Sequence, residues 1–185
     1  MVFMTVLRKT RHALVLLAVS ALIWSTTGNV ASARAVQSPK DQQFVTQVVG
    51  GVKNSIAAVD GTRFEVNEFG LYFAASIFAD PAFASDMTAR AKSTCRKLNA
   101  AAKKGPKAVG AAARKIGSEI GQGDREALTQ LDADTSLTED DKFSVGIVIG
   151  MVAASVFSNG VRVYCPRHTK HVVTMTQAWT ASLSS

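Results

Sequence analysis

A long apolar run between Thr138 and Pro166 constrains this chain more than any other stretch. Thr138 can cap a helix through its hydroxyl, and three carboxylates follow it in what would be the first turn. Apolar residues then recur on nearly every side of the helix until Pro166 ends it. The run therefore predicts a buried central helix. Its most apolar part, residues 143–157, has 15 residues, which is short of the roughly 20 that a membrane span needs and favours a core helix.

Residues 1–35 have the order of parts of a secretory signal peptide. Basic residues precede an apolar segment of 12 residues, 13–24, and small residues follow it. Two overlapping Ala-x-Ala motifs place cleavage after Ala33 or after Ala35. The alternative is an uncleaved membrane anchor, but the apolar segment is shorter than a span requires. We expect the protein to be secreted or held in the cell envelope.

The chain has two cysteines, Cys95 and Cys165, and both lie beyond the predicted signal peptide. Export implies an oxidising compartment, and two cysteines allow one pairing. A bridge would close a loop of 70 positions, which the chain-entropy model values at roughly 4 kcal/mol. The alternative is a pair of free or metal-bound thiols.

Several further helices are predicted before the central one. Ser38 and Asp80 each precede a proline, so each is the expected N-cap of a helix whose first residue is that proline. Between them, residues 64–79 would form another helix. Gly105-Pro106 would separate the helix that begins at Pro81 from an Ala-rich helix, which Gly121-Gln122-Gly123 would then break.

The predicted fold class is all-α, with five or six helices around a long central apolar helix and one disulfide. Residues 36–166 would form the helical domain, with residues 124–131 as a short helix leading toward the central one. The C-terminal tail, residues 167–185, is weakly specified, and disorder is one of its alternatives.

Charge is distributed unevenly along the chain. The formal net charge of +7 falls to +3 once the four basic residues of the predicted leader are removed. Residues 90–115 hold basic residues and no acid, and residues 119–141 hold eight acids. Such blocks predict a dipolar surface that meets an anionic envelope polymer or a membrane surface, or else two solvated helix faces that partly neutralise each other. The cations expected to make that contact are Arg90, Lys92, Arg96, Lys97, Lys103, Lys104 and Lys107.

Motifs for chemistry are missing from the sequence. No nucleophile elbow, zinc-protease motif or phosphate loop is present. His168, His171 and Cys165 offer three metal ligands at most, and fewer if the cysteine is oxidised. The pair Glu65 and Glu68 is the remaining candidate for a hydrolase with a dispersed site. We therefore expect no catalytic residue, metal or cofactor, and a protein that is not an enzyme.

The sequence also bears on two binding functions, nucleic-acid binding and ligand carriage. Nucleic acid is disfavoured because residues 84–142, which contain the whole basic block, have no aromatic side chain for base stacking. A carrier of an apolar ligand or haem is the alternative function, because a set of aromatic residues in the second predicted helix and at the start of the third would line a pocket against the central helix. These residues are Phe69, Tyr72, Phe73, Phe78 and Phe83, and their other interpretation is ordinary core.

The surroundings of both cysteines resemble a known family. The segment Ala91-x3-Cys95-x2-Leu98, the ending Tyr164-Cys165-Pro166 and the opening Asp41-x2-Phe44 are similar to landmarks of small secreted mycobacterial proteins that carry the description "domain of unknown function". The resemblance implies an exported helical domain with a Cys95–Cys165 bridge, and it brings no catalytic residues. Together these features predict an actinobacterial secreted protein that acts as a non-enzymatic binding or structural module.

Overall fold

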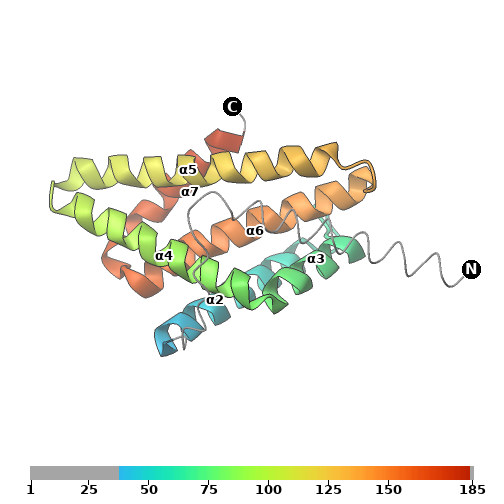
Figure 1. The fold of residues 1–185 in the computed structure, drawn as a ribbon, viewed down its shortest axis with the longest axis horizontal. Coiled ribbons are helices and arrows are strands. Elements are labelled where there is room, and N and C mark those ends of the chain that lie inside the picture. The colour runs from blue at the N-terminus through green and yellow to red at the C-terminus, as the bar shows by residue number, and fades with distance from the viewer. Residues whose placement is uncertain (1–37, 184–185) are drawn as a thin grey trace, which may run out of the picture.

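The computed structural model describes residues 38–183, so the predicted signal peptide lies outside the described residues. Within this range the chain forms six α-helices and one 3-10 helix, and no strand (Figure 1). The elements are α2 (Pro39–Val59), α3 (Glu68–Ala79), α4 (Pro81–Ala102), α5 (Pro106–Ala133), α6 (Glu139–Tyr164), η1 (Pro166–His171) and α7 (Val172–Leu183). The predicted all-α fold is confirmed.

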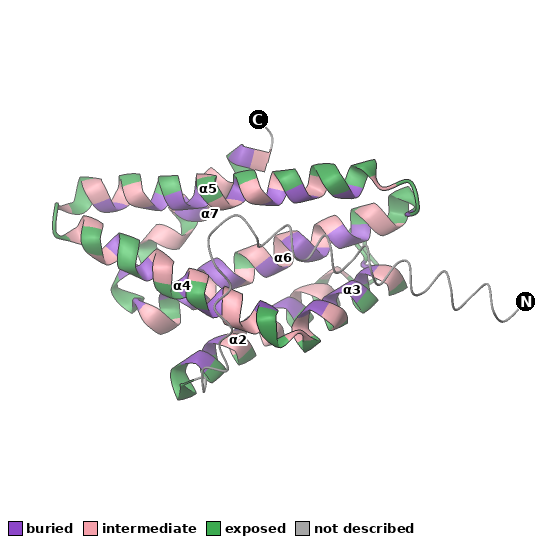
Figure 2. Ribbon diagram, viewed as in Figure 1, coloured by how far each residue is buried: buried purple, intermediate pink, exposed green. Residues whose placement is uncertain are grey.

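Helix α6 is the central element, as predicted. Its N-cap Thr138 accepts a hydrogen bond from the backbone N–H of Asp141 at 3.1 Å, and three acids occupy the first turn. The helix packs against α2, α3, α4 and α7. The expectation of burial on nearly every side is too strong, because Phe143 is 51% exposed and much of the helix is only partly covered (Figure 2). α6 has the length and composition of a membrane span, but half of that segment is buried inside the fold.

Helix α2 begins where the sequence predicted. Ser38 and Asp41 form a reciprocal capping box, which satisfies two backbone N–H groups at the start of the helix. Its core stripe of Phe44, Val48 and Val52 is fully buried against α6 and α4.

Helix α3 begins later than predicted, at Glu68 instead of Phe64. The cause is Asn67, whose side chain caps the backbone N–H of Gly70 at 2.9 Å. Asn67 also donates from its backbone to Ser144 and from its side chain to Asp141, so contacts with α6 fix the start of the helix.

Helix α5 is one helix of 28 residues, so the predicted break at Gly121-Gln122-Gly123 is wrong. Gly121 remains helical at a place where α7 lies against it, as α7 also does at Gly117. A Cβ at Gly117 would collide with the carbonyl oxygen of Met175, and a Cβ at Gly121 would lie 2.6 Å from that of Trp179. The close approach of α7 compensates for the roughly 1 kcal/mol that a helical glycine costs relative to alanine.

The segment after Pro166 folds through Leu183 as η1 and α7, so disorder is the wrong alternative for residues 167–183. Helix α7 runs along α5, and Met175 is fully buried between them (Figure 1). Sequence patterning failed here because the apolar content of the segment is modest and its partner surface is a row of small residues.

Candidate functional site

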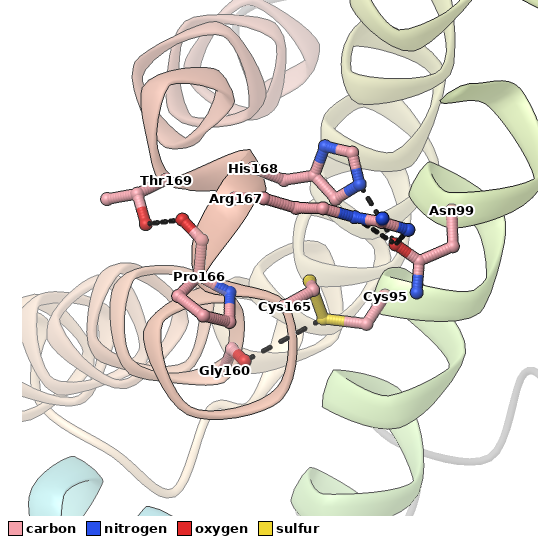
Figure 3. The surroundings of a disulfide bond; sticks show 8 residues. All are labelled: Cys95, Asn99, Gly160, Cys165, Pro166, Arg167, His168 and Thr169. Carbon is pink, nitrogen blue, oxygen red and sulfur yellow. Dashed lines mark hydrogen bonds between the residues drawn. A yellow bond between two sulfur atoms is a disulfide. The ribbon is translucent and has the colours of Figure 1, made fainter. Parts of the chain in front are cut away.

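The two cysteines form a disulfide that joins α4 to the end of α6 (Figure 3). Their Cα atoms are 5.7 Å apart, and both residues are buried in an apolar cluster with Leu98, Ile116 and Val161. The predicted pairing is confirmed, and no free cysteine remains among the described residues.

Of the two histidines after the disulfide, His168 lies against α4. His168 is buried, and its Nε2 lies 2.9 Å from the Oδ1 atom of Asn99 (Figure 3). Because a carbonyl oxygen only accepts, this pairing requires the tautomer protonated at Nε2. Burial, and then the nearby charge of Arg167, lower the pKa of His168. Within residues 38–183 no group of three metal-binding side chains occurs, so the metal site considered at Cys165, His168 and His171 gains no support.

A buried carboxylate lies where α2, α4 and α6 meet. Asp41 accepts hydrogen bonds from the Tyr164 hydroxyl at 2.7 Å and the Lys92 ammonium at 2.8 Å. Burial raises the pKa of Asp41, but hydrogen bonds from Lys92, Tyr164 and Ser38 outweigh it and hold the pKa at about 2. The network fixes the three helices to one another near the disulfide.

The predicted basic residues divide into two groups. Arg90, Lys92 and Lys97 face acids, with Lys97 bonded to Glu119 at 2.8 Å. The other four form no ion pair within residues 38–183 and are exposed: Arg96, Lys103, Lys104 and Lys107. They are joined by exposed Arg167 and Lys170, because Asn99 binds Arg167 and holds η1 beside α4. We call Arg96, Lys103, Lys104, Lys107, Arg167 and Lys170 the cationic end.

The acidic block lies at the other end of the molecule. The turn between α4 and α5 and the loop between α5 and α6 are separated by the 28 residues of α5, a length of about 42 Å (Figure 1). Exposed Asp132, Glu139 and Asp140 surround the second of these. Glu119 is the acid of this block that forms ion pairs with the basic block, at Lys97 and Lys115. The two blocks are therefore separated along the long axis, as the dipolar alternative requires.

An apolar cavity of about 40 Å³ lies among α3, α4, α5 and α6. Of the five aromatic residues predicted to line a pocket, Phe73 and Phe83 do so. Phe69 and Phe78 pack against the core, and Tyr72 is 56% exposed. The cavity is far smaller than the roughly 300–1,000 Å³ of ligand pockets, and neither histidine nor cysteine lines it. A carrier of haem would require these helices to separate.

Two charged groups lie in the wall of this cavity, Arg90 and Asp124. The sequence pattern predicts Arg90 only as a surface cation and does not single out Asp124. Asp124 is 5% exposed, and its Oδ2 accepts the indole N–H of Trp179 at 2.6 Å. Burial raises the pKa of Asp124 to about 6, against the opposing effects of Trp179 and Arg90. A signal existed, because Asp124 stands on the stripe of Gly117, Ile120 and Ala127 that faces inward.

This buried carboxyl makes stability depend on pH. Because its folded-state pKa lies above the unfolded value of 3.8, the folded protein binds the extra proton, and the contribution to stability rises as pH falls from about 6 to about 4. The gain is at most about 3 kcal/mol. The free energy of unfolding, measured in urea from pH 7 down to pH 4, should therefore change in favour of the native protein relative to Asp124→Asn.

Asp132→Asn, at an exposed position on the same helix, removes one charge in the same way and is the control. Parallel profiles for the native protein and Asp124→Asn would contradict the assignment.

A larger polar groove of about 900 Å³ lies over α6, between α2 and α7. Amide and hydroxyl side chains dominate its lining, Arg162 is its charged residue, and no acid or aromatic side chain contributes. Glu65 and Glu68 are exposed and line neither this groove nor the cavity.

Comparison of the chain with protein-family models, curated proteins and solved structures finds no match. The resemblance of the cysteine segments to secreted mycobacterial proteins therefore stays a prediction.

Proposed function

We propose that the protein is an exported, non-enzymatic binding module of the cell envelope, which attaches to an anionic polymer through the cationic end. The separation of charge along the molecule carries this proposal. Within residues 38–183 the cations of this end form no ion pair, so they remain available to an external anion.

The buried disulfide supports the export part of the proposal, because disulfides persist in oxidising compartments. The disulfide also helps to make the binding surface rigid. The bridge, together with the Asp41 network, joins α2, α4 and α6 just beneath the exposed cations. A rigid base reduces the conformational entropy that the protein would lose on binding.

An anionic polymer fits this end better than a membrane surface. Peripheral membrane attachment combines cations with apolar side chains that enter the lipid. Here one large apolar residue, Val173, is exposed close after η1, and the other exposed ones are Phe64, Leu71, Tyr72 and Phe143. These four residues lie in or near α3 and the start of α6, which is the opposite end of the molecule.

Binding of sodium polyacrylate, a polymer with carboxylates and no amide groups, tests the proposal at low and high salt. Neutralising two lysines, Lys104→Gln with Lys107→Gln, should weaken binding at low salt about tenfold or more, at about 1 kcal/mol for each cation near an anionic surface. The difference should shrink in 0.5 M salt, where charges are screened.

Arg63→Glu is the matched control, since it also lowers the net charge by two but lies in the loop before α3. If it weakens binding as much as the lysine pair does, net charge and not the cationic end is responsible. Binding to phosphatidylglycerol vesicles with none to polyacrylate would favour a membrane partner and contradict the proposal.

A further inference from the structure

We infer that the polar groove between α2 and α7 binds an extended acidic polypeptide segment, which enters it from the cationic end. This inference rests on the proposed function, because it names the class of anionic polymer and the surface along which it lies.

One stripe of α2 forms the side of the groove. Gln43, Gln47, Gly50 and Asn54 recur at the spacing of a single helical face. The three amide side chains form no hydrogen bond within the described residues, so each has both a donor and an acceptor available. Gly50 adds no side chain, and a Cβ there would meet nothing within 4 Å. The stripe is a row of amides with a gap in the middle.

The seam between α2 and α6 holds this row in place. The Ser155 hydroxyl donates to the carbonyl of Val48 at 3.1 Å, and the Asn159 amide donates to the carbonyls of Ser155 at 3.0 Å and Gln47 at 3.4 Å. Asn159 therefore uses its donors within the fold, while its side-chain oxygen remains an acceptor on the groove.

The dimensions match an extended peptide. From Gln43 to Ser55 the groove follows twelve residues of α2, which is about 18 Å of helix. An extended chain covers that distance with about five residues. Amides four residues apart on α2 are separated by about 6 Å along its axis, close to the roughly 7 Å over which an extended backbone repeats its pattern of donors and acceptors.

The charge of the lining indicates an acidic segment. Arg162 is exposed in the last turn of α6, where the groove meets Val172 at the start of α7. Helix η1, with Arg167 and Lys170 of the cationic end, lies between these two residues in the chain. Since no acid lines the groove, carboxylates of the ligand meet no repulsion along it, and Arg162 attracts them at the end nearest the cationic end.

Isothermal titration with decaglutamate and with polyacrylate of matched length and charge tests the inference, because only the peptide has backbone amides. The variant Gln43→Ala/Gln47→Ala/Asn54→Ala keeps the net charge and replaces surface residues by a good helix former. It should bind decaglutamate about tenfold more weakly and polyacrylate nearly as well as the native protein does. Gly50→Phe, which fills the groove, should have the same selective effect.

Gln122→Ala with Gln130→Ala, at exposed positions of α5, is the control and should change neither affinity. If the groove variants leave decaglutamate binding unchanged, or weaken polyacrylate binding equally, the inference is overturned while the cationic end can still bind polymer. Binding of neither polymer to the native protein would overturn the proposed function as well. Far-UV circular dichroism establishes that each variant is folded. The triple alanine variant removes polar groups and Gly50→Phe blocks the groove, so the same loss of decaglutamate binding in both would assign it to the groove.

Discussion

Replacing both cysteines by alanine is expected to lower the free energy of unfolding by about 4 kcal/mol. The bridge closes a loop of 70 positions, and its removal returns conformational freedom to the unfolded chain. A loss of this size is a large share of the typical stability of a domain. Denaturant unfolding of the oxidised protein, followed by circular dichroism, measures it. Alanine is the appropriate replacement because both side chains lie in an apolar cluster, where a serine hydroxyl would be buried without a partner.

Reduction of the native disulfide provides the control for this prediction, because it opens the loop without changing the chain. The reduced protein and the double alanine variant should unfold at similar denaturant concentrations. If the oxidised native protein and the double variant differ by less than about 1 kcal/mol, residual structure in the unfolded chain has removed the entropic benefit, and the prediction fails.

Local signals explain what the sequence predicted well. The starts of α2, α4 and α6 each depend on a cap and its next few residues, and these were recognised at Ser38, Asp80 and Thr138. The disulfide followed from counting, since two cysteines allow one pairing. The charge blocks were visible too, but their separation was not, because it depends on α5 continuing past Gly121 without a break.

Contacts between distant segments explain what the sequence did not predict. The groove needs α2, α6 and α7 together, and nothing in the amides of α2 alone distinguishes a binding stripe from a solvated face. The cavity could not be predicted for the same reason. Its wall contains Arg90 of α4 and Asp124 of α5, while Tyr72 of the predicted aromatic pocket is exposed. These are consequences of helix packing and not of local pattern.

The packing of α7 depends on a row of small residues, so a side chain placed there should have a large effect. Gly117→Val is expected to lower the free energy of unfolding by about 3 kcal/mol, because the new atoms collide with the backbone of Met175, which cannot rotate away as a side chain would. Trp179 should report the displacement. Its indole donates to Asp124 and its ring lies 6.5 Å from that of Phe157. Since the other tryptophan, Trp24, belongs to the predicted signal peptide, the fluorescence of the cleaved protein comes from α7 alone.

Gly110→Val isolates the steric cause, because Gly110 lies on the same helix and a Cβ there would meet nothing within 4 Å. This variant should be neutral or slightly stabilising, since valine is a better helix former than glycine by a few tenths of a kcal/mol. It should also leave the emission of Trp179 unchanged. If the two variants behave alike, α7 does not depend on close approach to α5. The glycines would then need another explanation, and the continuity of α5 past Gly121 would no longer be accounted for by the contact with α7.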